Sequence, residues 1–164
     1  MHINGIRAAR PYLDSHAYGI GESIVKTVLL PVDGSESANR AAWHVTFEEG
    51  EKVVAKVVLL NVQPEVLGWQ TRDLAQDAIR TRLRARADEA FAFARRLLAA
   101  AKIPFEEVGE SGDPAETIVR VAAAHHCDAI VLGTRGLGRV AGAMLGSVAY
   151  KVVHHAAVPV TLVK

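Results

Sequence analysis

Cysteine and aromatic residues are scarce in this chain of 164 residues. The single cysteine, Cys127, has no second cysteine with which to form an internal disulfide, which favours a reducing compartment. Of all residues, 50% are hydrophobic but only 5% are aromatic, so aliphatic side chains must form the core. That composition suits buried parallel strands covered by alanine-rich helices. The length is that of one domain, which can bury a core without metals or disulfides.

The chain also lacks a strong charge imbalance and a long apolar run. Its formal net charge is +1 and its pI is near 8.0, so no general electrostatic attraction to DNA or anionic membranes is expected. It contains no run of about 18 apolar residues, the length that a membrane-spanning helix needs. The N-terminus lacks the apolar segment of a signal peptide. We therefore expect a cytoplasmic protein.

Residues 1–23 differ from the rest of the chain. They show neither helical nor strand periodicity, and they contain Gly5, Pro11, Gly19 and Gly21. We expect an N-terminal extension that is poorly ordered. The alternative is a segment that docks on a partner subunit. The folded domain is expected to comprise residues 24–164.

Five short apolar segments have the length and composition of buried strands. They cover residues 27–33, 56–62, 105–110, 129–133 and 158–163. Segments with helical spacing separate them, at 38–50, roughly 73–101, 114–126 and 147–155. Asp113, Pro114 and Glu116 are typical of a helix N-terminus, with a capping carboxylate followed by proline at the first helical position. The inward face expected for the long second helix comprises Ile79, Leu83, Ala90, Ala94 and Leu97.

Strands and helices thus alternate along the whole domain. This order predicts parallel pairing, right-handed crossovers and helices on both faces of one sheet. Sheets of this kind bind ligands beyond the carboxyl ends of their strands, where the strand order reverses. We expect the first and fourth strands to be neighbours at that point, which places Asp33 beside Gly133. Asp33 could contact a ribose hydroxyl, form a turn with Gly34 and Ser35, or do both.

The connection after the fourth strand is rich in glycine. Five of the fourteen residues from 133 to 146 are glycines: Gly133, Gly136, Gly138, Gly142 and Gly146. A plain strand-to-helix connection needs about 2–6 residues, whereas this one has about thirteen, and loops of that length are usually functional. The first amides of the helix that begins at Ser147 have no partners within the helix, so they can bind an anion. Arg135 or Arg139 would add the positive charge needed for useful affinity.

The spacing Gly133-x2-Gly136-x9-Gly146-Ser147 resembles the nucleotide-binding signature G-x2-G-x9-G-[S/T] of the universal stress protein family. Residues 29–35, Leu-Leu-Pro-Val-Asp-Gly-Ser, are similar to the first strand and turn of that family. Residues 157–163, Ala-Val-Pro-Val-Thr-Leu-Val, resemble its last strand. The resemblance covers roughly residues 25–164 and leaves residues 1–23 outside.

This resemblance implies a fold, a ligand and an assembly. The fold is a single-domain three-layer α/β/α sandwich, with a five-stranded parallel sheet of order 3-2-1-4-5 (adenine nucleotide alpha hydrolase-like). The ligand is ATP, ADP or AMP with Mg²⁺ or Mn²⁺. The assembly is a homodimer formed through the last strand, whose edge would otherwise be exposed.

The resemblance also implies the residues that contact the nucleotide. Asp33 would contact ribose and adenine, the main chain of Val62 would recognise adenine, and Leu132 would pack on the base. Phosphates would lie among the glycines and Ser147. The full predicted set is Pro31, Val32, Asp33, Val62, Leu132, Gly133, Arg135, Gly136, Gly146, Ser147 and Val148, with Arg135 added for its charge and position.

Other nucleotide motifs fit less well. Gly136-x-Gly138-x-x-Ala141 matches a dinucleotide fingerprint, but no acidic residue follows in the next strand. A Walker P-loop is excluded because Gly138 is followed by Arg139 and Val140, not by lysine and a hydroxyl residue.

Metal, catalytic and nucleic-acid sites are also weakly supported. His125, His126, Cys127 and Asp128 are consecutive, so in a helix they point in different directions and do not converge on one ion. Ser147 and His154 are seven residues apart in a helix, roughly 10 Å, which is too far for a nucleophile and its base. Four arginines lie two residues apart in the second helix: Arg80, Arg82, Arg84 and Arg86. At that spacing they fan around the helix, which is typical of a solvated face.

The sequence therefore predicts an ATP-binding regulatory protein that is not an enzyme. Two alternatives remain: a slow ATPase of the same fold, and a nucleotide-free dimeric interaction module.

Overall fold

The computed structural model describes residues 26–47, 54–65, 76–137 and 145–164. The expected N-terminal extension, the helix end near residue 50 and the start of the second helix at 73 lie outside these ranges. So do Gly138, Arg139 and Gly142 of the glycine-rich loop.

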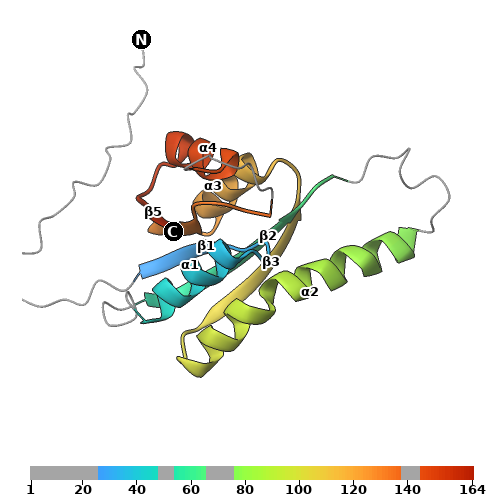
Figure 1. Cartoon of the computed structure of the whole chain (residues 1–164), viewed down its shortest axis with the longest axis horizontal. Helices are drawn as coiled ribbons and strands as arrows, with labels where there is room; N and C mark the ends of the chain where they lie inside the picture. Colours follow the sequence, from blue (N-terminus) through green and yellow to red (C-terminus); the bar gives the residue numbers. More distant parts are fainter. Residues whose placement is uncertain (1–25, 48–53, 66–75, 138–144) are drawn as a thin grey trace, which may run out of the picture.

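The described residues form one five-stranded sheet in which every pairing is parallel (Figure 1). Its strands are β1 (Lys26–Pro31), β2 (Val54–Gln63), β3 (Phe105–Ser111), β4 (Ala129–Gly133) and β5 (Val160–Val163). The order across the sheet is β3-β2-β1-β4-β5, which confirms the predicted 3-2-1-4-5 topology. The strand order reverses between β1 and β4, so the carboxyl ends of these strands are the expected ligand position.

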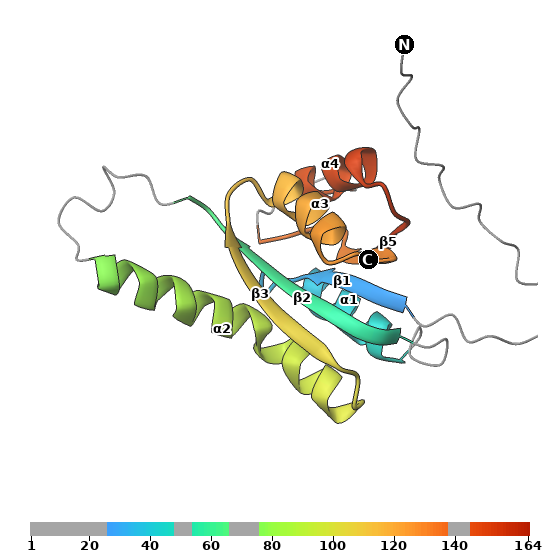
Figure 2. The same cartoon turned by 180° about the vertical axis from the view of Figure 1, so that it is seen from behind.

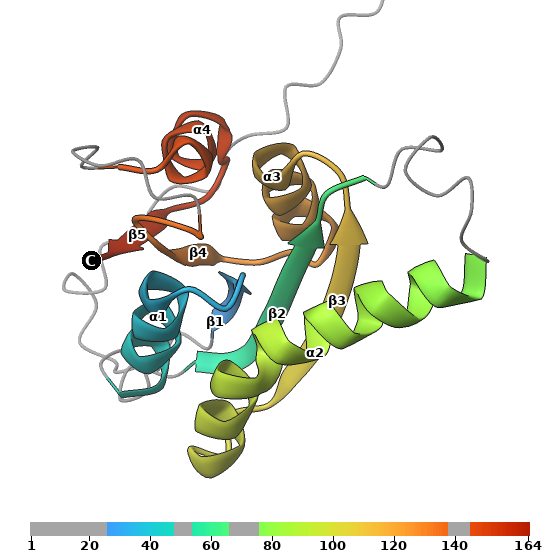
Figure 3. The ribbon, with the colours of Figure 1, turned by 45° about the vertical axis from the view of Figure 1, so that its right-hand side comes forward.

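In the described ranges, four helices cover the two faces of the sheet. They are α1 (Glu36–Phe47), α2 (Gln76–Ala100), α3 (Pro114–Ala124) and α4 (Ser147–His155). Helices α1 and α2 pack on one face and α3 and α4 on the other, as Figure 3 shows. The domain is thus the predicted three-layer α/β/α sandwich.

Two hydrophobic layers separate the sheet from its helices. Along β1, Val28 and Leu30 face α1 and α2, whereas Leu29 between them faces α3 and α4. All three side chains are fully buried. A strand that is buried on both faces reads as a continuous apolar run, which is why this part of the sequence shows no alternation.

Helix α2 packs through its carboxyl-terminal half only. Its buried residues are Ala90, Phe91, Ala94 and Leu98. Of the predicted inward face, Ala90 and Ala94 are buried, but Ile79, Leu83 and Leu97 are only partly so. The first half of α2 extends past the sheet, as Figures 1 and 2 show, so its apolar residues have no strand beneath them.

Among the residues described, no helix combines the length and the apolar character required to cross a lipid bilayer.

Candidate functional site

The carboxyl ends of β1 and β4 lie side by side. Val28 pairs with Ala129 and Leu29 pairs with Ile130 in parallel register. The segment that follows β1 therefore meets the segment that follows β4. These two segments contain most of the predicted site residues, and the end of β2 lies on the other side of β1.

Asp33 links the two segments. Its Oδ1 accepts a hydrogen bond from the amide of Ser35 at 2.9 Å, and its Oδ2 accepts one from the amide of Leu137 at 3.1 Å. The turn expected at Gly34 is present, with φ of +83° at this glycine. A carboxylate has about four lone-pair positions, so Asp33 keeps acceptor capacity for a ligand hydroxyl.

Two glycines of the motif, Gly133 and Gly136, leave no room for a Cβ atom. A Cβ on Gly133 would lie 2.5 Å from the main-chain carbon and the Oγ of Ser37. On Gly136 it would lie 2.7 Å from Oδ2 of Asp33. Packing alone therefore explains why these two positions are glycine. The evidence for a ligand depends instead on the neighbouring main-chain amides.

The N-terminus of α4 differs from those of α1 and α3. In α1, Oγ of Ser35 accepts a hydrogen bond from the amide of Ala38 at 3.2 Å. In α3, Asp113 accepts hydrogen bonds from two main-chain amides, as its sequence predicts. Helix α4 begins after Gly146, and no side chain among the described residues caps it.

Among the described residues, no acceptor pairs with the first amides of α4. The first hydrogen bond of the helix runs from the amide of Tyr150 to the carbonyl oxygen of Gly146. The amides of residues 147–149 precede that bond and point out of the helix end. Together with the helix dipole they favour an anion. Gly146 itself is held by a 2.7 Å hydrogen bond from its amide to the carbonyl oxygen of Thr134.

All eleven predicted site residues lie within the described ranges. Those at strand ends are Pro31, Val32 and Asp33 at β1, Val62 at β2, and Leu132 and Gly133 at β4. Arg135 and Gly136 follow β4, and Gly146, Ser147 and Val148 lie at the start of α4. The sheet order brings these segments to one edge, where β2, β1 and β4 are consecutive neighbours.

Three polar residues that support this edge were missed in the sequence, namely Asn61, Ser37 and Thr134, and so was the contact of the Ser35 hydroxyl with Arg135. Asn61, 3% exposed, donates from Nδ2 to the carbonyl oxygen of Val32 at 2.8 Å and so fixes the residue before Asp33. Its amide within an otherwise apolar strand was the available signal. The main chain of Arg135 is held by the hydroxyl groups of Ser35 and Ser37, and the main chain of Thr134 by Val163 and Gly146. Their roles depend on tertiary contacts that sequence spacing does not reveal.

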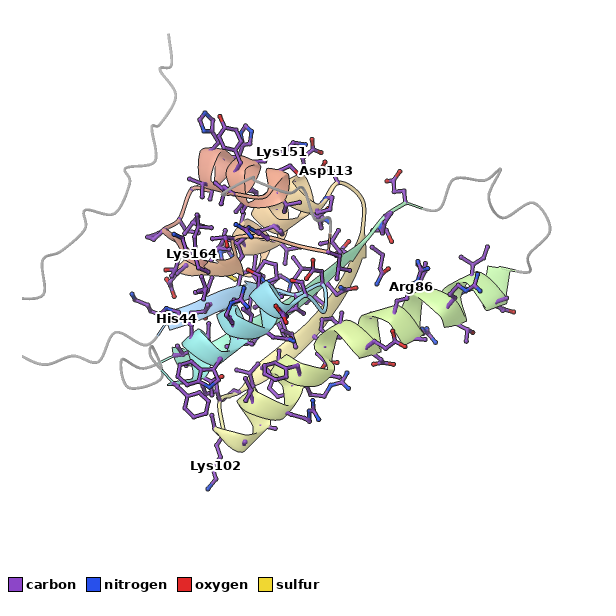
Figure 4. All side chains as sticks on the ribbon, viewed as in Figure 1. His44, Arg86, Lys102, Asp113, Lys151 and Lys164 are labelled. Atoms are coloured by element: carbon purple, nitrogen blue, oxygen red, sulfur yellow. The ribbon has the colours of Figure 1, made fainter. Side chains whose placement is uncertain are left out.

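Lys151 connects the two helices on the far face. Its Nζ lies 3.3 Å from Oδ2 of Asp113, so the first turns of α3 and α4 are tied together (Figure 4). The amide of Glu116 is the main cause that lowers the pKa of Asp113, and Lys151 lowers it further.

The histidine and cysteine residues after α3 lie elsewhere, at the opposite end of the strands. Nδ1 of His125 is 2.6 Å from Oε1 of Glu106, which also pairs with Lys56 at 2.9 Å. Burial raises the pKa of the Cys127 thiol to about 11. The described residues contain no group of three or more histidine, cysteine or acidic side chains that could hold a metal ion.

Comparison with known proteins identifies the family of the chain. The model of the universal stress protein family matches residues 25–164. A universal stress protein from Thermus aquaticus, named for its position 3′ of a QAH/OAS sulfhydrylase, is 37% identical over 140 residues, which are 85% of this chain and 98% of the relative.

Solved structures show the same fold. Universal stress protein UspA from Lactobacillus plantarum superposes with a TM-score of 0.70 at 25% identity, covering 85% of this chain and 97% of that one. A universal stress protein in complex with cAMP superposes with a TM-score of 0.57 at 26% identity, covering 85% of this chain and 96% of that one. The chain belongs to the universal stress protein family.

Proposed function

We propose that this protein binds ATP at the carboxyl edge of its sheet and acts as a nucleotide-dependent regulator. The observation that carries the proposal is the uncapped N-terminus of α4. Among the described helices α1, α3 and α4, it alone lacks a side-chain acceptor at its first turn, and the signature glycines precede it. The cAMP complex of a structural relative supports an adenine nucleotide as the ligand class.

In this proposal the triphosphate accepts hydrogen bonds from the amides of Ser147 and Val148 and from the hydroxyl of Ser147. Gly133, Gly136 and Gly146 let the chain approach the phosphates closely, and Arg135 adds positive charge. The free lone pairs of Asp33 accept a ribose hydroxyl. Adenine is recognised by the main chain of Val62. Pro31, Val32 and Leu132 complete the wall around the base.

The proposed metal is Mg²⁺ or Mn²⁺ carried by the nucleotide. Mg²⁺ is commonly held by one or two carboxylates together with substrate phosphates. Asp33 is the carboxylate among the predicted site residues, and the described residues provide no cluster that would hold an ion alone. The residues therefore fit an ion that arrives with the phosphates.

We further propose that nucleotide binding, not catalysis, is the activity of this protein. An enzyme of this kind would need a base within hydrogen-bond reach of the attacking group. Asp33, the carboxylate among the predicted site residues, already accepts hydrogen bonds from Ser35 and Leu137. It is thus held as an acceptor, which suits ligand binding better than proton transfer.

Assembly through β5 is part of the same proposal. Among the described residues, β5 pairs with β4 on one side only. A second copy of the chain would cover its outer edge and satisfy the unpaired main-chain groups.

Calorimetric titration with ATP, ADP, AMP, cAMP and NAD, each with and without Mg²⁺, tests the proposal. We expect the original protein to release or absorb heat on binding ATP. A Ser147→Pro variant, which lacks the first amide of α4 and the hydroxyl, should bind ATP with an affinity lower by about tenfold or more. The matched control is Ser111→Ala, at the end of β3, which should leave the affinity unchanged. Preference for NAD, or no heat with any adenine nucleotide, contradicts the proposal. Phosphate release that is lost in Ser147→Ala protein would instead favour the slow ATPase.

A further inference from the structure

The amino-terminal part of α2 lies clear of the sheet. Residues 76–86 extend past the strands, whereas the rest of the helix packs on β2 and β3 (Figures 1 and 2). Ile79, Leu83 and Ala87 are partly buried and lie about one turn apart, so they form a narrow apolar stripe that continues into buried Ala90. We call residues 76–86 the projecting half and these three side chains the apolar stripe. Of the described strands, none lies beneath the projecting half.

Four exposed arginines border the apolar stripe. Neighbouring residues of a helix point about 100° apart. Arg80 and Arg84 each follow a stripe residue, so they lie along one side of it. Arg82 and Arg86 each precede a stripe residue, so they lie along the other side; Figure 4 shows Arg86 on the projecting half. The sequence spacing predicts a solvated face for these arginines, and the structure adds the stripe between them.

The charge of the projecting half is unbalanced. It contains four arginines and one acidic residue, Asp77, which gives a net charge of +3. Oδ1 of Asp77 lies 3.1 Å from Nη2 of Arg80, and both side chains are largely exposed. Within the described residues, the other three arginines have no acidic partner. The projecting half therefore attracts anionic groups.

Arg95, in the packed half of the same helix, shows the contrast. Its Nε and Nη2 donate to the carboxylate of Glu107 at 2.6 and 2.9 Å, and its Nη2 also donates to Asp88 at 3.1 Å. In the projecting half, each side of the stripe carries two arginines four residues apart, a like-charge spacing that destabilises an isolated helix. Carboxylates from another molecule would remove that repulsion, so the arrangement favours an acidic partner.

We propose that the projecting half of α2 docks an acidic amphipathic helix of another protein. Two helices associate when their apolar stripes meet and opposite charges lie along the flanks. Here Ile79 and Leu83 supply the stripe, and the arginines on both sides supply the cations. Two projecting halves do not suit each other, because each carries the same net charge of +3. The inference goes beyond the nucleotide site and does not depend on it.

Other anionic partners match only part of the surface. Nucleic-acid phosphates would pair with the arginines, but they would leave the apolar stripe in water. An anionic membrane requires a broad apolar face that sinks between the lipid headgroups. The stripe is one side chain wide and has arginines within about 100° on both sides, so it is too narrow for that role. An acidic helix uses both the stripe and the charges.

Fluorescence anisotropy tests the surface with the full chain and no nucleotide. The probe is a labelled synthetic helix of three heptads, with leucine along one stripe and glutamate on both sides of it. We expect saturable binding that weakens as salt is raised, because exposed charge pairs are screened. In the double variant Arg82→Glu/Arg84→Glu, which reverses one charge on each side, the affinity should fall by about tenfold. Leu83→Gln keeps the approximate size of the side chain and should lower the affinity by about fivefold.

The matched control reverses two charges at the other end of the helix. Arg96→Glu/Lys102→Glu changes two exposed cations there and gives the same net charge as the first double variant. It should bind the probe as the original protein does. An equal loss of affinity in the two double variants would show that net charge alone governs binding, which overturns the proposal.

Further measurements locate the probe and compare the other occupants. Hydrogen exchange of the original protein should slow at residues 76–86 when the probe is bound, and slowing confined to another surface overturns the proposal. Duplex DNA and vesicles of phosphatidylserine and phosphatidylcholine are compared in the same binding assay. The proposal is also overturned by absence of peptide binding, by equal binding of a peptide with the same residues in scrambled order, or by tighter binding of DNA or vesicles than of the peptide.

Discussion

Asp33 and Leu137 are 104 residues apart in the sequence, yet the amide of Leu137 donates a 3.1 Å hydrogen bond to Oδ2 of Asp33. The other oxygen of this carboxylate is held by Ser35 at 2.9 Å. One side chain thus fixes both the turn after β1 and the glycine-rich segment after β4. Gly136 fits between them because it has no Cβ, which would lie 2.7 Å from Oδ2.

The first prediction concerns this carboxylate. Asp33→Ala should lower ATP affinity by about tenfold or more, because it removes the ribose acceptor and releases the segment at Leu137. Asp33→Asn keeps one oxygen acceptor and should therefore lower the ATP affinity less than Asp33→Ala does. Calorimetry of the three proteins checks the order. Equal ATP affinity in all three would contradict the role of Asp33.

A second prediction tests whether close packing is the reason for glycine at position 133. Gly133→Ala should destabilise the fold by about 1–3 kcal/mol, the cost of forcing a methyl group into a filled site. The contact is with the main chain of Ser37 as well as with its Oγ, so shortening that side chain does not relieve it. Urea unfolding measures the loss.

Gly109→Ala is the matched control for Gly133→Ala. A Cβ at Gly109, in β3, would meet no atom within 4 Å. The same substitution should therefore leave the unfolding free energy within about 0.5 kcal/mol. Equal losses at the two positions would show that the close contact at Ser37 is not what requires glycine.

Much of the architecture could be predicted because local signals agree with the tertiary structure. The apolar run that contains Val28 and Leu30 predicts a strand that is buried on both faces, and β1 is one. Asp113 and Pro114 predict the start of α3, where the structure places it. In both cases the residues that decide the local structure are consecutive in sequence.

The remaining features depend on contacts between distant residues. The helical spacing of α2 predicts which face of the helix points inward. It does not show that the sheet ends beneath the middle of the helix, so that only the second half of α2 is buried. Arg135 is assigned to the phosphates by its charge, and nothing in the sequence indicates that Arg40 and Lys164 lie near it. Asn61 stands out as an amide in an apolar run, but its contact with the carbonyl oxygen of Val32 joins two different strand ends and cannot be read from spacing.

A third prediction concerns the cap of α3. Asp113→Ala removes the acceptor for two main-chain amides and should cost about 1 kcal/mol of stability at neutral pH. Asp77→Ala is the control, because the Asp77 side chain is 91% exposed and its ion pair among the described residues, with Arg80, lies at the surface. It should change the unfolding free energy by less than about 0.5 kcal/mol.

The pH dependence of this effect follows from the pKa of Asp113. Its folded-state pKa lies below the ordinary value of 3.8, chiefly because the amide of Glu116 donates to the ionised form. The stabilisation is therefore present above that ordinary value and is lost as the pH falls through the folded-state pKa. Unfolding curves between pH 7 and pH 2 should show the difference between the original protein and Asp113→Ala narrowing as the pH falls below 3.8. A difference that stays constant with pH would contradict this account.

A fourth prediction concerns Cys127, which is 5% exposed. Burial raises the pKa of its thiol to about 11, so at pH 8 very little of it is thiolate. Ellman's reagent should modify it at least about 100-fold more slowly in the folded protein than in urea, because the thiolate is the reactive form. Similar rates in the two states would show that the thiol is accessible and ionisable.

The last prediction concerns the outer edge of β5. The carbonyl oxygens of Pro159 and Val163 accept hydrogen bonds from the β4 side, so the alternate residue Leu162 directs its amide outward. Leu162→Pro removes that amide without removing a bond to β4, and it should convert the proposed dimer to a monomer in light scattering. Leu162→Ala is the matched control, because it loses the same side chain but keeps the amide, so it should remain dimeric. If Leu162→Pro also remains dimeric, the subunits associate through another surface, and the edge of β5 is not what holds them together.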